Sequence, residues 1–141
     1  MIERIAFEDQ IIAIIVRSGF HGEGVEFFTP DDFSQQLGYL SHPKGTRITP
    51  HRHNMVHRQV SQTQEVLFIR KGKVRLDLFN DTEHYVGSRF LEAGDVVLLA
   101  SGGHGFEVLA DLEMFEVKQG PYIGDADKTH FRGPTESDQF S

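Results

Sequence analysis

Residues 65–80 read EVLFIRKGKVRLDLFN, and this stretch decides the fold. Apolar and polar residues alternate over Glu65–Arg70 and again over Lys73–Asn80, which is the period of a half-buried β-strand. Lys71-Gly72 lies between the two runs and predicts the turn of a β-hairpin. After Asn80-Asp81, a further β-like run follows at His84–Leu91. We therefore expect an antiparallel meander here.

The rest of the chain has the same pattern of short β-like runs separated by turn residues. The further strand candidates are Ile11–Arg17, Val25–Thr29, Leu37–Leu40, Thr46–Thr49, Val96–Ala100, His104–Leu109 and Leu112–Lys118. The strongest helical candidate is one short turn at Asp31–Gln36. About ten short strands at this spacing are typical of an all-β sandwich or barrel. We expect one all-β domain over residues 1–133 and a flexible C-terminal tail over residues 134–141.

Composition excludes several classes of function. The 141 residues include no cysteine, which rules out a disulfide scaffold, a thiol nucleophile and cysteine-ligated metal. The net charge of −7 argues against general binding to nucleic acid or to anionic membranes. The longest wholly apolar run, Ile11–Val16, is too short to span a bilayer. Because no signal-peptide pattern opens the sequence, we expect a cytoplasmic protein.

The charge is unevenly distributed along the chain. Residues 33–76 contain eight basic residues and one acidic residue, Glu65, which gives this stretch a net charge of +7. One interpretation is a positive pocket for a small anionic molecule, in which arginines bind a carboxylate or phosphate. The alternative is that these bases pair with acids on neighbouring strands. The candidate substrate-binding residues in this stretch are Arg47, His57, Arg58 and Arg70.

Four of the eight histidines also fall in this basic stretch, two of them in the sequence Pro50-His51-Arg52-His53. On an extended chain, residues two apart project from the same face, so both imidazoles could reach one point. Gly45 precedes His51 by five intervening residues, and Glu65 precedes Gly72 by six. Downstream, an apolar run opens at Gly94 and leads to a third histidine in Gly102-Gly103-His104.

This spacing resembles the two sequence motifs of the cupin superfamily, whose members are jelly-roll β-barrels. Gly45, His51, His53, Glu65 and Gly72 match the first motif, although the eleven residues between His53 and Glu65 are more than is usual. The second motif is matched more loosely by Gly94, Gly102 and His104, with Ala100 in place of a proline. The resemblance covers about residues 20–120 and implies a cupin-like double-stranded β-helix.

The resemblance also implies a metal site formed by His51, His53, Glu65 and His104. Imidazole and carboxylate ligands suit a single divalent transition metal such as Fe, Mn, Ni, Co, Cu or Zn. The local pattern supports Glu65 as a ligand, because Glu65 lies two positions from Leu67 and four from Ile69 and would face the same apolar interior. A carboxylate there is costly unless it is paired or metal-bound.

The long spacer makes His57 a rival ligand to Glu65. His57 follows His53 by four positions, where the family's glutamate would lie without an insertion. Glu65 keeps the six-residue offset to Gly72 and is the preferred ligand, which leaves His57 as a pocket residue, an alternative ligand or an exposed side chain.

Taken with the charge pattern, the resemblance implies a metal-dependent enzyme, an oxygenase or isomerase, acting on a small carboxylate- or phosphate-bearing molecule, sugar derivatives included. One alternative is a metal-independent epimerase or isomerase of polysaccharide synthesis. Another is a non-catalytic cupin that binds or senses a ligand. Since cupins commonly dimerise, we expect a homodimer. No residue is assigned a catalytic role, because one fold hosts many reactions.

Overall fold

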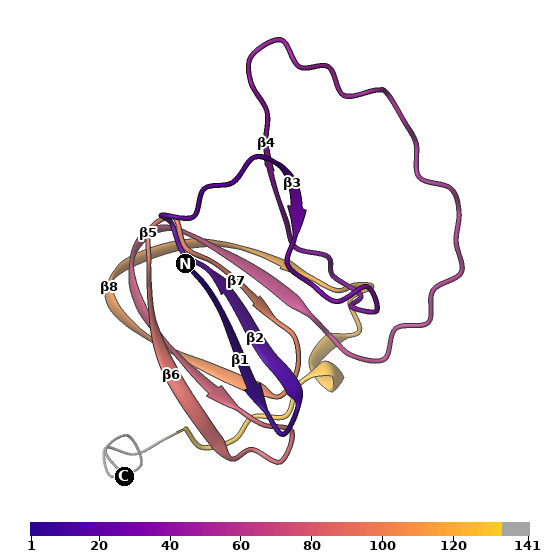
Figure 1. Cartoon of the computed structure of the whole chain (residues 1–141). Coiled ribbons are helices and arrows are strands. Elements are labelled where there is room, and N and C mark those ends of the chain that lie inside the picture. The colour runs from indigo at the N-terminus through magenta and orange to yellow at the C-terminus, as the bar shows by residue number, and fades with distance from the viewer. Residues whose placement is uncertain (134–141) are drawn as a thin grey trace.

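The computed structural model describes residues 1–133, whose regular structure is almost entirely β-strand (Figure 1), and this confirms the predicted all-β class. Within this range the strands are β1 (Ile2–Phe7), β2 (Gln10–Val16), β3 (Gly24–Phe27), β4 (Gly38–Ser41), β5 (Glu65–Phe79), β6 (Tyr85–Glu92), β7 (Val96–Leu99) and β8 (Gly103–Lys118). The tail expected at residues 134–141 lies outside the described residues.

Six of the strands form one curled antiparallel sheet with the order β1-β2-β7-β5-β6, and β8 pairs with β5 along its length. The sheet bends around its concave face into a half-barrel, whereas β3 and β4 form a separate two-stranded sheet (Figure 1). Strand β5 is the central element, because it pairs with β6, β7 and β8.

The core lies on both faces of this sheet. The larger cluster combines Leu67, Ile69 and Leu76 of β5 with Ile12 and Val97 of the neighbouring strands. A second cluster is built on Ile14, Val16 and Phe28. Because β2 contributes to both clusters, its sequence is a continuous apolar run and not an alternating one.

The predicted hairpin at Lys71-Gly72 is wrong, because residues 65–79 form the single strand β5. The run at 104–109 and the run at 112–118 are likewise one strand, β8, and the two long strands pair from end to end. Gly72 bends the strand without reversing it. Its φ is +92°, the register shifts on either side of it, and an added Cβ would overlap the carbonyl oxygen of Asp111.

The helical turn expected at Asp31–Gln36 is also wrong, because this segment consists of turns and bends. The side-chain amide of Gln36 donates hydrogen bonds to the carbonyl oxygens of Pro30 and Phe33. In a helix, backbone N–H groups would bond to these carbonyl oxygens. The one helix in residues 1–133 is a 3₁₀ turn, η1 (Gly124–Asp127). No helix in this range is long and apolar enough to cross a membrane.

The strand expected at Thr46–Thr49 is absent, since no residue between 42 and 64 belongs to a strand. This segment, which we call the 42–64 loop, connects β4 to β5 and runs as a wide excursion away from the sheet (Figure 1). Its apolar residues Ile48, Met55, Val56 and Val60 are exposed.

Candidate functional site

Glu65 and His104 meet at one end of the half-barrel, although 39 positions separate them in the sequence. The distance from His104 Nε2 to Glu65 Oε2 is 3.3 Å. Glu65 opens β5 and pairs with Leu99 at the end of β7. The turn that follows passes through Gly102, where a Cβ would overlap the carbonyl oxygen of Phe79, and leads into β8. His104 pairs there with Leu78, near the other end of β5, so its contact with Glu65 requires β5 to curl until its two ends approach each other.

The environment of Glu65 is that of a paired, buried carboxylate. Its residue exposure is 8%, and Leu67 and Ile69 on the same face of β5 are fully buried, as the alternation predicts. The hydrogen bond from His104 lowers the pKa of Glu65 below its ordinary value, and this outweighs burial, which raises it. Glu65 is therefore held in its ionised form beside an imidazole.

Two further charged residues, Glu116 and Lys118, belong to the same cluster and were not among the predicted site residues. Lys118 is the direct cross-strand partner of Glu65, and Glu116 is the partner of Leu67. Burial, reinforced by the charge of Glu65, raises the pKa of Glu116. The available signal was the alternation of these residues with Phe115 and Val117, which places them on the opposite side of β8.

His51 and His53 lie in the 42–64 loop and are exposed, outside the Glu65–His104 contact. Their ring centroids are 5.4 Å apart with the ring planes at 75°, so the two imidazoles stay close without a strand to align them. The Nδ1 of His51 lies 3.0 Å from the carbonyl oxygen of Thr49.

The candidate anion-binding residues divide into two groups. Arg47, His57 and Arg58 are exposed in the 42–64 loop and take part in no ion pair among residues 1–133. Arg70 instead forms a 2.6 Å ion pair with Glu113 and lies over the ring of Phe115. The interpretation that bases pair with acids on neighbouring strands thus holds for Arg70 and not for the loop residues.

The four predicted metal ligands are therefore brought together in two pairs, His51 with His53 and Glu65 with His104. Within residues 1–133, no group of three or more histidine, aspartate or glutamate side chains is arranged to hold a metal ion. The arrangement described does not by itself fit a metal, although its donors are of the right chemical type. The four-residue metal site stays a prediction.

Comparisons of the chain with protein-family models, with curated proteins and with solved structures find no match.

Proposed function

We propose that the protein is a small metal-binding cupin that acts on a small anionic molecule, with His51, His53, Glu65 and His104 as the metal ligands. The observation that carries this proposal is the contact between Glu65 and His104. The sequence contains twenty-one acidic residues and eight histidines, and the resemblance to the cupin motifs picks out Glu65 and His104 among them. These two residues are in contact within a curled β-sheet.

Metal binding requires the 42–64 loop to close over the half-barrel, and the free edge of β8 offers a place for it. Among the described residues, β8 pairs only with β5, so the main-chain groups along its other edge have no strand partner. A long unpaired edge favours the addition of another strand. The inner-facing Phe106 and Val108 of β8 are also partly exposed, at 37% and 56%.

Charge and side-chain character favour the 42–64 loop as the strand that pairs with this edge. The loop carries four basic residues and no acidic one. Strand β8 carries four acidic residues and one lysine; Glu107 and Glu113 pair with arginines of β5, which leaves Asp111 and Glu116 for the loop. The exposed apolar residues of the loop could cover those of β8, because both sets lose contact with water on closure. Closure would complete the barrel as a jelly roll.

The chain is long enough for this movement. Twelve residues lead from His53 to Glu65, and an extended chain spans about 3.3 Å per residue, or roughly 40 Å in all. A domain of this size has a radius of gyration of about 14 Å. His51 and His53 can therefore reach Glu65 and His104 within one chain.

In the closed form, the four ligands would leave open positions on the metal, which would supply Lewis-acid chemistry to a substrate oxygen. The protein's own contribution would be to exclude water and to orient the substrate. Arg47 and Arg58, which have no ion-pair partner among residues 1–133, would move with the loop and add positive charge around the anionic substrate.

Metal content tests this proposal directly. The protein is purified without chelator, incubated separately with Fe(II), Mn(II), Ni(II), Co(II), Cu(II) and Zn(II), passed through a desalting column and subjected to elemental analysis. We expect about one equivalent of one metal, reduced at least tenfold in His51→Ala and in His104→Ala. His42→Ala, a histidine of the same loop outside the motif, is the matched control and should keep the metal. Less than about a tenth of an equivalent in the wild type would refute the proposal.

The Glu65–His104 contact also favours a second candidate, a metal-independent isomerase or epimerase. An imidazole held by a carboxylate is the arrangement of a general base with the group that orients it. Hydrogen–deuterium exchange at carbon, measured by NMR on sugar nucleotides in D₂O with chelator-treated protein, would support this candidate if it is lost in His104→Ala. Metal uptake without any turnover would instead indicate a ligand-binding protein. The homodimer and the cytoplasmic location expected from the sequence stay predictions.

A further inference from the structure

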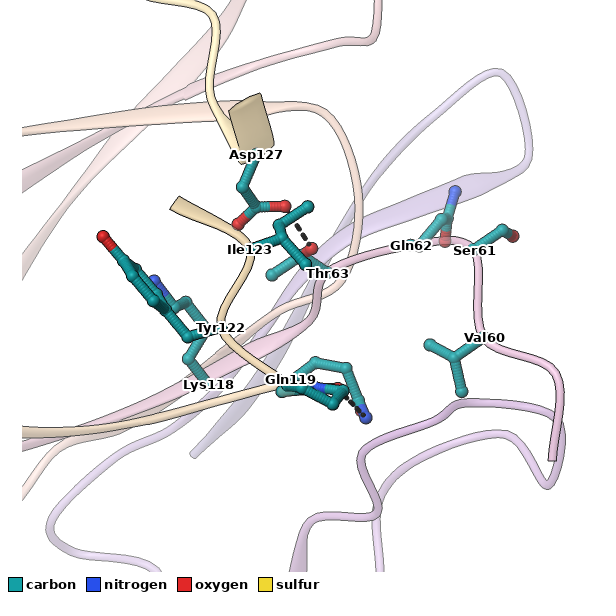
Figure 2. Close-up of a pocket in the computed structure, with 11 residues that line it drawn as sticks. Val60, Ser61, Gln62, Thr63, Lys118, Gln119, Tyr122, Ile123 and Asp127 are labelled. Atoms are coloured by element: carbon teal, nitrogen blue, oxygen red, sulfur yellow. Dashed lines mark hydrogen bonds between the residues drawn. The ribbon is translucent and has the colours of Figure 1, made fainter. Parts of the chain in front are cut away.

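A hollow next to the Glu65–His104 site is lined by none of the residues that the sequence analysis singled out as ligands. It lies between the end of the 42–64 loop and the segment that follows β8, and its volume is about 220 Å³. Figure 2 shows Lys118 and Tyr122 toward one side of it and Val60, Ser61 and Gln62 toward the other.

Lys118 and the adjoining backbone link the hollow to the candidate site. Lys118 lines the hollow and is also the direct cross-strand partner of Glu65. Directly opposite residues of an antiparallel pair have Cβ atoms about 5 Å apart. The backbone N–H of Gln119, another lining residue, donates a 3.0 Å hydrogen bond to the carbonyl oxygen of Gln64. Lys118 is therefore shared by the hollow and the Glu65–His104 cluster.

The lining is rich in groups that bind hydroxyls, with a single cation. Asp127 Oδ1 accepts a 2.9 Å hydrogen bond from the hydroxyl of Thr63, so the carboxylate is held in place while its second oxygen is left for a ligand (Figure 2). The side-chain amide of Gln119 also lines the hollow and is hydrogen-bonded to Gln35 and to the carbonyl oxygen of Gly120. Tyr122 is 82% exposed and presents an aromatic face, which suits the C–H face of a sugar ring.

Size limits the class of ligand. The hollow is smaller than the roughly 300–1,000 Å³ of pockets that enclose drug-sized molecules. It can take one small ring but not a dinucleotide or a folded peptide segment.

We propose that this hollow binds a single-ring sugar acid, with the carboxylate of the ligand on Lys118 and its hydroxyls on Asp127. This inference rests on the proposed function, because it names the anionic molecule that the Glu65–His104 site would act on. The ring would lie against Tyr122, with its carboxylate kept on Lys118.

Isothermal titration calorimetry of the full chain with sodium glucuronate, glucose and sodium acetate tests the inference. We expect glucuronate to bind more tightly than either glucose or acetate, because only glucuronate has both the charge and the hydroxyls. Lys118→Met should weaken glucuronate binding at least about tenfold, since it removes a charge-assisted hydrogen bond. Asp127→Asn should weaken glucuronate and glucose alike. Lys71→Met, on β5 opposite Glu113, is the control and should bind as the wild type does.

Equal binding of acetate and glucuronate, or unchanged binding in both Lys118→Met and Asp127→Asn, would overturn the inference. Metal content separates it from the proposed function. Lys118→Met should keep the metal and lose glucuronate, whereas His104→Ala should lose the metal and keep glucuronate. A wild-type protein that binds glucuronate without any metal would refute the metal site and leave the sugar-acid site standing.

Discussion

At the residue scale, the pKa values of the two glutamates of the cluster are shifted in opposite directions. The hydrogen bond from His104 lowers the pKa of Glu65, so this group stabilises the fold above its ordinary pKa of about 4.3 and loses that effect as the pH falls. Burial and the charge of Glu65 raise the pKa of Glu116, so its ionised form opposes folding at neutral pH. The ionised form of Glu65 is therefore favoured in this cluster, whereas the ionised form of Glu116 is disfavoured.

We predict that Glu116→Gln stabilises the protein at pH 7. The folded-state pKa of Glu116 lies above its unfolded value, so its favourable contribution is complete in acid and is lost as the pH rises. Because the burial of Glu116 is only partial and solvent screens its charge, the gain should be no more than about 1 kcal/mol and should fall away below about pH 4. Urea unfolding at the two pH values measures it. Glu113→Gln, on the same strand but paired with Arg70, is the control and should not stabilise. A loss of stability in Glu116→Gln at pH 7 would contradict the assignment.

Sequence reasoning could find Glu65 and His104 but not Glu116 and Lys118, for a physical reason. A lone carboxylate alternating with Leu67 and Ile69 is visible in the sequence because burial is costly for it. The partnership of Glu65 with Lys118 depends on the register of two strands that are far apart in the chain, which local alternation does not specify.

At the scale of elements, the sequence predicted strand runs more accurately than the connections between them. Alternation located both halves of β5 and of β8, yet each pair of halves was separated by a turn that does not exist. Glycine between two apolar runs signals either a hairpin or a bend in one strand. Because β5 pairs with β8 on both sides of Gly72, this glycine bends one strand and does not form a hairpin turn. The paired residues are far apart in the sequence, so the local pattern does not reveal them.

We predict that Gly72→Ala destabilises the domain by about 3 kcal/mol or more. The positive φ of Gly72 disfavours a side chain, and the Cβ would collide with the backbone of Asp111. Thermal and urea unfolding measure the effect. Gly105→Ala is the matched control, because this glycine of β8 has no atom within 4 Å of an added Cβ, and it should cost less than about 1 kcal/mol. Equal effects of the two substitutions would contradict the role given to Gly72.

At the scale of the whole molecule, the uneven charge of the sequence corresponds to two separate parts of the structure. The 42–64 loop holds unpaired bases and four histidines away from the sheet, whereas β8 carries acids along an edge with no strand partner in residues 1–133. Opposite charges on two exposed elements attract over about 8–10 Å at physiological ionic strength. Closure of the loop would therefore be favoured by charge and, if the proposed site exists, fixed by metal, because only the closed form would unite the four proposed ligands.

We predict that metal protects the 42–64 loop from trypsin. The protease cuts after Arg47, Arg52 and Arg58 only in the open form, so the cleavage rate reports the population of that form. One equivalent of the metal taken up in reconstitution should slow these cuts at least about tenfold in the wild type, because binding shifts the equilibrium toward the closed form. Cleavage after the exposed Arg132, followed by mass spectrometry in the same samples, is the internal control and should not change. His104→Ala lacks a ligand on the sheet, so its loop should stay susceptible with or without metal. Equal protection in wild type and His104→Ala would show that metal acts on the loop histidines alone, and closure onto β8 would then be wrong.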